Sequence, residues 1–352
     1  MVRFSRNELL DFYEAPLPEL QAASSFVRHR LNGKRVWYNR NFHIEPSNIC
    51  AHRCRFCSYR RDEATQAGAW SMGLDDILPY CESKFRPGMT EIHIVGSVQP
   101  DRPFSYYRQI VAIARDFARE HGTVERPVTV KAYTAVEIDD MARYNHLPAE
   151  EVLLQLKDAG LETMPGGGAE IFAPAVRRQI CPDKCTGERW LDIHRSAHRL
   201  GLPTNCTMLF GHIESREDRV DHLLALRALQ DETSGFNAFI PLKFRARDNA
   251  LSALGEISEE EVLRTFAVAR LALDNIPHIK AYWPMLGKDL ALEAMAWGAD
   301  DLDGTINDST KIYSLAGARD QRPTLSVPEL KARVAASGWQ AVERDSFYRI
   351  LS

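Results

Sequence analysis

Two spacings of hydrophobic positions alternate along the chain. Short runs of apolar and β-branched residues are typical of strands, and longer segments with apolar residues three or four positions apart are typical of helices. The predicted strands are His43–Cys50, Glu91–Val98, Val128–Thr134, Glu162–Pro165, Thr204–Leu209, Asn237–Leu242, Ile279–Trp283 and Asp301–Ile306. The predicted helices between them are Leu74–Lys84, Ser105–His121, Ala149–Ala159, Trp190–Leu200, Arg216–Gln230, Ser258–Asp274 and Lys288–Trp297.

This alternation predicts the fold class. Eight strands with seven helices between them, and an eighth helix after Ile312, favour a closed (β/α)8 TIM-type barrel over an open doubly wound sheet. We expect residues 1–35 to form an N-terminal helical extension and residues 36–323 to form the barrel. Residues 324–352 are predicted to be a C-terminal tail packed on it.

The functional groups of such a barrel come from the C-terminal ends of its strands. Polar and glycine residues collect at these positions of the sequence. In chain order they are Cys50–Cys57, Gly96–Gln99, Lys131–Thr134, Pro165–Glu170, Gly211–Glu214, Lys243–Arg247, Trp283–Met285 and Asp303–Thr305. We therefore expect one site, built from several loops at this end.

Composition narrows the class of protein. The chain has 352 residues, of which 45% are hydrophobic and 26% charged, and its net charge is −4. These values support a large core and do not favour a nucleic-acid binder or a membrane-surface protein. No apolar run approaches the roughly 20 residues that span a bilayer, and the charged N-terminal residues do not predict a signal peptide. We expect a soluble, cytoplasmic protein without membrane insertion or a nucleic-acid partner.

Three of the seven cysteines form a close group. The odd number favours reduced thiols over a disulfide framework. Cys50, Cys54 and Cys57 have C-x3-C-x2-C spacing, and three thiolates can hold three irons of a four-iron cubane cluster. The fourth iron would then be open to a substrate or cofactor. A zinc site with His52 as an added ligand, and a ferredoxin-type site with a fourth cysteine, are the alternatives.

A second C-x3-C pair, Cys181 and Cys185, has nothing nearby to complete a metal site. We interpret these two as incidental thiols in a loop between helices.

The cysteine triplet at the end of the first strand, with Phe56 before its third member, resembles that of the radical S-adenosylmethionine (SAM) enzymes. The resemblance implies a 4Fe–4S cluster held by Cys50, Cys54 and Cys57, with SAM chelated to the fourth iron. It also implies an electron donor such as flavodoxin or ferredoxin. One-electron reduction would cleave SAM to methionine and a 5′-deoxyadenosyl radical.

Longer blocks of sequence narrow the resemblance. Five of them resemble the aminofutalosine synthases of the futalosine route to menaquinone: KAYTAVEI (131–138), MPGGGAEIF (164–172), TNCTMLFGHIE (204–214), LQDETSGFNAFIPL (229–242) and DDLDGTINDSTKIYSLAGA (300–318). The enzymes that cyclise dehypoxanthine futalosine share the cysteine loop and the GGGAE block, and are one alternative. A non-catalytic iron–sulfur or zinc protein is an alternative of a different class.

The resemblance implies the substrate 3-[(1-carboxyvinyl)oxy]benzoate, which bears two carboxylates. The deoxyadenosyl radical would add to its enolpyruvyl double bond, and rearrangement with loss of carbon dioxide would give 6-amino-6-deoxyfutalosine. Lys131, His212 and Arg245 lie at or near predicted strand ends and are the candidate catalytic residues. For Arg245 the alternative is a solvated basic loop, and for His212 a satisfied core histidine.

The resemblance also implies which residues contact SAM. The candidates for cofactor binding are Phe56, Tyr59, Gly96, Ser97, Gly167, Gly168 and Glu170. Many radical SAM enzymes carry a Gly-Gly-Glu segment after the second strand; here Gly96 is present, but the segment has no acid. Three glycines before Glu170 would let the backbone approach a ligand, although a tight turn explains them as well.

Overall fold

The structure is a computed structural model that describes residues 3–305 and 324–351. Its strands are β1 (Arg35–Ile44), β2 (Glu91–Ile94), β3 (Thr129–Ala132), β4 (Thr204–Phe210), β5 (Phe236–Lys243), β6 (His278–Ile279), β7 (Asp301–Thr305) and β8 (Gln340–Glu343). Its α-helices are α1 (Arg6–Glu14), α2 (Leu17–Asn32), α3 (Ile77–Lys84), α4 (Phe104–His121), α5 (Ala135–Tyr144), α6 (Ala149–Ala159), α7 (Pro174–Ile180), α8 (Gly187–Arg199), α9 (Arg216–Thr233), α10 (Glu259–Ala272), α11 (Trp283–Leu286), α12 (Lys288–Glu293) and α14 (Val327–Ala336). The 3-10 helices are η1 (Leu74–Asp76), η2 (Ser252–Leu254) and η3 (Ala294–Trp297).

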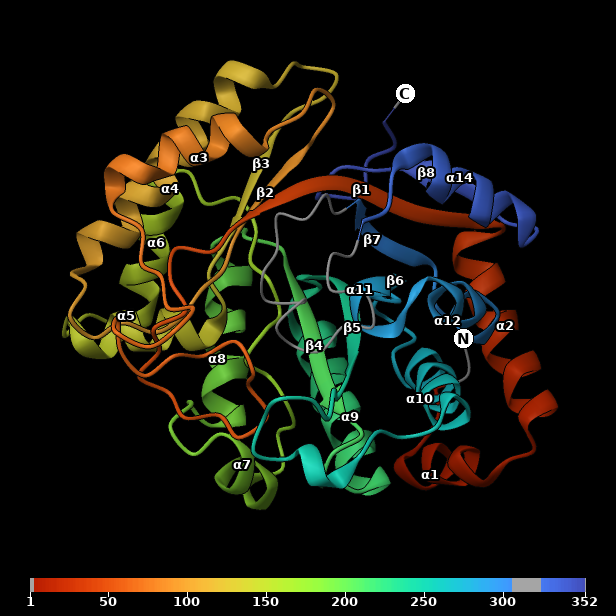
Figure 1. Ribbon diagram of the computed structural model, residues 1–352. Helices are drawn as coiled ribbons and strands as arrows, with labels where there is room; N and C mark the ends of the chain where they lie inside the picture. Colours follow the sequence, from red (N-terminus) through yellow and green to blue (C-terminus); the bar gives the residue numbers. More distant parts are fainter. Residues whose placement is uncertain (1–2, 306–323, 352) are drawn as a thin grey trace.

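The strands close into a parallel barrel, with helices around it (Figure 1). β3, β2, β1 and β7 are paired in that order, and so are β4, β5 and β6. Single-residue bridges join the two groups: residues 163 and 164 link β3 to β4, and Lys280 pairs with Asp301 of β7. The predicted (β/α)8 fold class is therefore confirmed, with residues 163–164 in place of a regular fourth strand.

The boundaries of several predicted strands were wrong, and the second, placed at Glu91–Val98, ends at Ile94 in β2. The first was placed at His43–Cys50, but β1 begins at Arg35 and ends at Ile44. Polar residues on the inward face of β1 obscured the strand pattern, because the inside of this barrel is not apolar. The seventh was placed at Ile279–Trp283, but β6 ends at Ile279 and Trp283 begins α11. The helix predicted after Ile312 lies outside the described residues.

Inward and outward side chains differ in chemistry. Ile92 of β2 belongs to the hydrophobic core between strands and helices. Its neighbours Glu91 and His93 face the other way, and they are in register with Asn41 and His43 of β1. Alternate residues of a strand point to opposite faces, so the inside of the barrel is polar where the outside is apolar.

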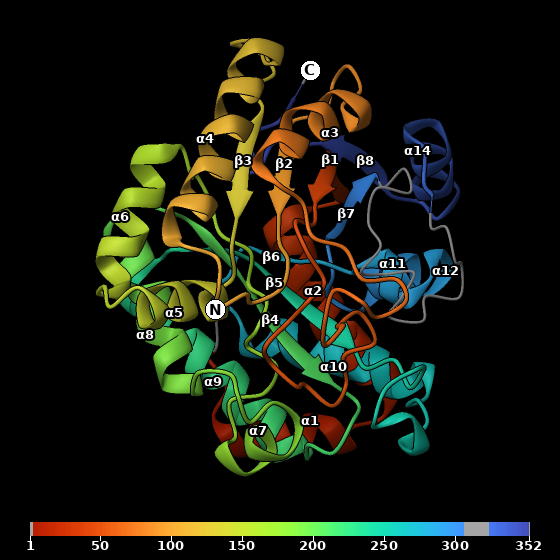
Figure 2. The ribbon, with the colours of Figure 1, turned by 60° about the vertical axis from the view of Figure 1, so that its left-hand side comes forward.

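The C-terminal residues close the barrel end at which the strands begin. β8 pairs in parallel with Arg35–Tyr38, the first part of β1. Beyond β8, Arg344 donates to the Asp301 carboxylate at 2.6 Å. In Figure 2 the arrowheads of β2 and β3 point toward the orange loop after β1, and the C-terminus lies at the opposite end. We call the arrowhead end the mouth and the other end the closed end.

At the other terminus, α1 and α2 precede the barrel and pack against α9 and α10 on its outside (Figure 1). None of the helices within residues 3–305 and 324–351 is both long enough and apolar enough to cross a membrane.

Candidate active site at the mouth of the barrel

The loop after β1, which carries the three cysteines, is held by its own backbone. The Cys50 N–H donates to the Arg61 carbonyl at 3.0 Å, and the Arg61 N–H donates to the Asn48 carbonyl at 2.8 Å. The Arg61 guanidinium also donates to the carbonyls of Ser58, Tyr59, Arg60 and Ala67. A loop without regular structure needs such partners for its polar backbone groups, and here one arginine supplies many of them.

This cysteine loop adjoins the segment that follows β2. The Ala51 N–H donates to the Val98 carbonyl at 2.9 Å, and the Val98 N–H donates to Cys50 Sγ at 3.4 Å. Parallel neighbouring strands bring the loops after them to the same end of the barrel. The first cysteine is thereby fixed against the second strand's loop.

The donor set fits a cluster with three protein ligands. Cys50, Cys54 and Cys57 are free thiols and partly exposed. Burial raises the pKa of the Cys50 thiol and raises that of Cys54 to about 12, so iron would have to displace their protons. Within the described part of the chain, no three His, Cys, Asp or Glu side chains surround a single-ion position. In a cubane cluster each thiolate binds a different iron, so the thiols need not converge on one point.

His52, the candidate fourth zinc ligand, is turned away to α5. Its Nε2 lies 3.0 Å from Asp140 Oδ2, and both side chains are buried. Arg143 pairs with the same carboxylate. The contact ties the cysteine loop to α5, and it occupies the histidine with a structural partner.

An acidic side chain of α5, Glu137, lies against the segment after β2. The Gly96 N–H donates to Glu137 Oε1 at 3.1 Å, while the Thr134 N–H and hydroxyl donate to Oε2 at 2.7 and 2.8 Å. Burial raises the pKa of Glu137 to about 7, although these hydrogen bonds lower it. Sequence analysis missed Glu137. Its spacing from Thr134 is that of a helix capping box, which indicates the contact with Thr134 but not the one with Gly96.

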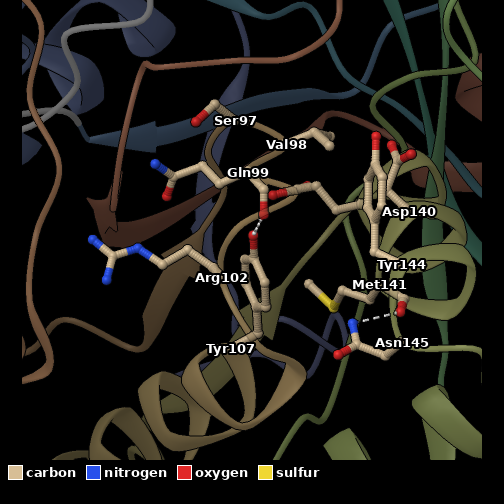
Figure 3. Close-up of a pocket in the computed structure, with 10 residues that line it drawn as sticks. Ser97, Val98, Gln99, Arg102, Tyr107, Asp140, Met141, Tyr144 and Asn145 are labelled. Atoms are coloured by element: carbon tan, nitrogen blue, oxygen red, sulfur yellow. Dashed lines mark hydrogen bonds between the residues drawn. The ribbon is translucent and has the colours of Figure 1, made fainter. Parts of the chain in front are cut away.

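The same segment lines a small pocket between α4 and α5 (Figure 3). The Tyr107 hydroxyl donates to the Gln99 carbonyl at 3.2 Å and fixes the segment from α4. Ser97 is buried, and its hydroxyl has no hydrogen-bond partner among the described residues. A buried hydroxyl without a partner is uncommon in a native protein and fits a position completed by a ligand or water.

The two aromatic candidates of the cysteine loop have different surroundings. Tyr59 is buried, donates to the Ser47 carbonyl at 3.1 Å and packs edge-to-face against Trp70. Phe56 is only partly buried, and the Lys184 ammonium lies 5.4 Å from the centre of its ring. Tyr59 therefore stabilises the loop through its contacts with Ser47 and Trp70, whereas Phe56 lies near the charged Lys184.

The glycine run packs against protein atoms. A Cβ at Gly166 would lie 2.5 Å from the Cα of Cys206 on β4. A Cβ at Gly168 would lie 2.4 Å from a Val136 methyl, and its φ of +83° also favours glycine. Close packing thus accounts for these glycines, and contact with SAM at Gly167 and Gly168 stays a prediction. Glu170, after the run, pairs with Lys184 at 2.5 Å.

Lys131 lies inside the barrel and is buried, with its ammonium 2.5 Å from Glu91. A second interior lysine, Lys280, pairs with Asp303 at 2.8 Å. Sequence analysis missed Lys280 because its partner is on another strand. Asn39 of β1 is also fully buried, and neither of its amide atoms has a hydrogen-bond partner among the residues described.

The other two catalytic candidates have partners of their own. The His212 side chain is buried, with Nδ1 3.0 Å from Glu214 and Nε2 3.1 Å from the Leu209 carbonyl. Arg245 lies 3.1 Å from Glu256. The described contacts do not join Lys131, His212 and Arg245 to one another, and their catalytic role stays a prediction.

A closed parallel barrel with three free thiols in the loop after its first strand defines a class of protein, the radical SAM fold. The sequence matches the radical SAM superfamily over residues 44–226 and the CofH/MqnC C-terminal region over residues 233–350. The chain belongs to the radical SAM superfamily and is a radical SAM enzyme. Members of the superfamily use a 4Fe–4S cluster and SAM.

Relatives with assigned activities cover nearly the whole chain. It is 42% identical to the aminodeoxyfutalosine synthase of Thermus thermophilus, over 99% of this chain and 92% of that protein. It is 37% identical to the aminodeoxyfutalosine synthase of Streptomyces coelicolor, over 99% and 91%. The predicted resemblance to this group is confirmed. The cyclic dehypoxanthine futalosine synthase of the same organism is 34% identical, over 93% and 81%, so these relatives do not favour the cyclase.

A third activity occurs among similar proteins. A 5-amino-6-(D-ribitylamino)uracil–L-tyrosine 4-hydroxyphenyl transferase of Gloeobacter violaceus is 38% identical, over 94% of this chain and 85% of that protein. The crystal structure of methylornithine synthase superposes with a TM-score of 0.75 at 15% identity, over 97% and 94%, which supports the fold alone.

Proposed function

We propose that this protein acts in the futalosine route to menaquinone. It transfers the 5′-deoxyadenosyl group of SAM to 3-[(1-carboxyvinyl)oxy]benzoate and yields 6-amino-6-deoxyfutalosine. Methionine, carbon dioxide and a proton are released, and the electron used to cleave SAM is returned. The observation that carries the proposal is the three-thiol loop at the mouth of a barrel whose interior holds two buried lysines. The aminodeoxyfutalosine synthases among the relatives support the choice of substrate.

Cys50, Cys54 and Cys57 are the proposed ligands of the cluster. A bound 4Fe–4S cluster would supply the electron that cleaves SAM, and this cleavage would give the adenosyl group a carbon radical. Ser97 and Glu137 are the proposed contacts of the polar methionyl end of SAM. The Ser97 hydroxyl has no partner among the described residues, and Glu137 provides a buried carboxylate. The electron donor is proposed to be a flavodoxin or ferredoxin.

The interior lysines would bind the substrate's carboxylates. A lysine ammonium has three donors, and Glu91 occupies one donor of Lys131 while Asp303 occupies one of Lys280. The remaining donors suit an anionic oxygen ligand inside the barrel, together with the Asn39 amide, which has no partner within residues 3–305 and 324–351. Holding the alkene in a water-excluded space next to the radical source is then the protein's main contribution.

Product analysis with three candidate substrates tests the proposal. The anaerobically reconstituted, reduced protein is incubated with SAM and, separately, with 3-[(1-carboxyvinyl)oxy]benzoate, with dehypoxanthine futalosine, and with tyrosine plus 5-amino-6-(D-ribitylamino)uracil. We expect 6-amino-6-deoxyfutalosine in the first reaction, and no turnover in the others.

Each alternative has its own signature in this assay. Free 5′-deoxyadenosine formed with dehypoxanthine futalosine would assign the cyclase activity instead, and consumption of tyrosine would assign the transferase activity. The matched control is Cys57→Ala, which keeps the loop but removes one thiol. A wild-type protein without 4Fe–4S absorption would exclude all three activities.

A further inference from the structure

The Cys181–Cys185 segment, which follows α7, lies against the cysteine loop. The Arg55 N–H donates to the Ile180 carbonyl at 2.8 Å, and the Arg53 N–H donates to the Asp183 carboxylate at 2.7 Å. These bonds flank Cys54 on both sides in the sequence. The interpretation of Cys181 and Cys185 as incidental thiols is not affected by these bonds, but the segment that carries them supplies backbone and carboxylate partners to the cysteine loop.

Lys184 brings a positive charge from this segment to the cysteine loop. Its side chain is 14% exposed, and its ammonium lies 5.4 Å from the ring centre of Phe56, which directly precedes Cys57. Its carboxylate partner is Glu170, at 2.5 Å, whose side chain is 8% exposed. A paired charge so little exposed is held in one place, unlike a surface lysine that samples many rotamers.

The pairing with Glu170 keeps the Lys184 ammonium charged. Burial lowers the pKa of Lys184, but the Glu170 carboxylate, 2.5 Å away, holds that pKa above its usual value. The ammonium is thus positively charged at neutral pH and acts on the thiol end of the loop.

We propose that Lys184 is a positioning residue that sets the reduction potential of the cluster, with Glu170 as its counter-charge. The inference rests on the proposed binding of a 4Fe–4S cluster by Cys50, Cys54 and Cys57. Reduction places one electron from the external donor on the cluster, and a fixed cation nearby stabilises the more negative, reduced form. The partnered Glu170 carboxylate offsets part of that effect.

Two substitutions test the inference because they have opposite expected signs. Lys184→Met removes the cation and is expected to lower the ratio of reduced to oxidised cluster about tenfold at a fixed applied potential. For one electron, a tenfold change in this ratio corresponds to a shift of the midpoint potential by about 59 mV toward more negative values. Glu170→Gln leaves the ammonium without its counter-charge and is expected to shift the midpoint toward more positive values. The measurement is an anaerobic redox titration followed by electron paramagnetic resonance, without SAM or substrate.

Matched variants separate charge from structure. Lys184→Arg keeps the charge and should restore a near wild-type midpoint. Lys157→Met, an exposed lysine on α6, should leave it unchanged. If Lys184→Met cannot retain iron, Glu170→Gln decides alone: a positive shift supports the inference, and an unchanged midpoint overturns it. Lys184→Met and Glu170→Gln shifts of the same sign would also overturn it.

The two proposals fail differently. A wild-type protein that binds no cluster contradicts the proposed function. A wild-type cluster whose midpoint ignores both substitutions contradicts only the role of Lys184.

Discussion

The mouth and the closed end of the barrel differ in how their polar groups are satisfied. At the mouth, Ser97 has a buried hydroxyl without a partner among the described residues, and the thiols of the cysteine loop are free. At the closed end, Arg344 pairs with Asp301, and the Tyr348 ring stacks on His278 with 3.6 Å between centroids.

The chain's own C-terminal residues thus supply at one end what a ligand is proposed to supply at the other. The closed end also reaches the interior, because the Ser346 hydroxyl donates to Glu91, the partner of Lys131, at 2.7 Å. A barrel with one end sealed by its own chain can keep buried charges in place while its other end opens to a ligand.

The largest effect is expected from breaking the closed end. Arg344→Met leaves Asp301 buried without its main counter-charge, and we expect the free energy of unfolding to fall by about 3–5 kcal/mol. Denaturant unfolding of the apo-protein measures it. Arg349→Met is the control, since that arginine is 61% exposed and pairs with Asp345 of the same segment; its effect should stay below about 1 kcal/mol. Similar losses in both variants would refute the special role of the buried pair.

The two ends of the barrel should lose their contributions to stability at different pH values. Near the mouth, burial lowers the pKa of His43 from 6.5 to about 4, so its contribution to stability is complete above pH 6.5 and decreases as the pH falls toward 4. At the closed end, burial alone would raise the pKa of Asp301, but Arg344 and Lys280 hold it at about 2, so its contribution decreases below pH 3.8.

We therefore expect the apo-protein to lose stability in two windows, with about 3 kcal/mol attributable to His43 in the upper one. Denaturant unfolding at pH 7, 5, 4 and 2.5 measures this. His43→Asn should reduce the loss in the upper window by that amount and leave the lower window unchanged. Part of the upper loss should remain, because burial also lowers the pKa of His93, His194, His198 and His222. An unchanged slope in that variant between pH 6.5 and 4 would contradict the assignment.

A smaller effect is expected from the helix that leads into β8. Ser326 caps α14 by accepting a hydrogen bond from the Glu329 N–H, so Ser326→Ala should lower the free energy of unfolding by about 1 kcal/mol. Cluster absorption of the reconstituted protein should be unchanged, since α14 belongs to the closed end. Loss of absorption without loss of stability would show that the two ends are coupled more closely than the contacts indicate.

The sequence by itself determined the fold class and the identity of the thiol loop. The alternation of strand and helix patterns predicted the barrel, because the hydrophobic spacing of each strand and helix is contained within that segment of the sequence. The spacing of Cys50, Cys54 and Cys57 is also local, so it could be recognised without a structure. By contrast, β1 was misplaced because Asn39, Asn41 and His43 face a polar interior that no local pattern reveals.

Only the tertiary structure decided which distant groups meet. Glu137 reaches Gly96 from α5, and Lys184 reaches Glu170 and the cysteine loop from the segment after α7. Arg344 closes the barrel from the end of the chain by pairing with Asp301. Pairings between segments far apart depend on how strands are ordered around the barrel, and the spacing of residues along one segment carries no information about that order.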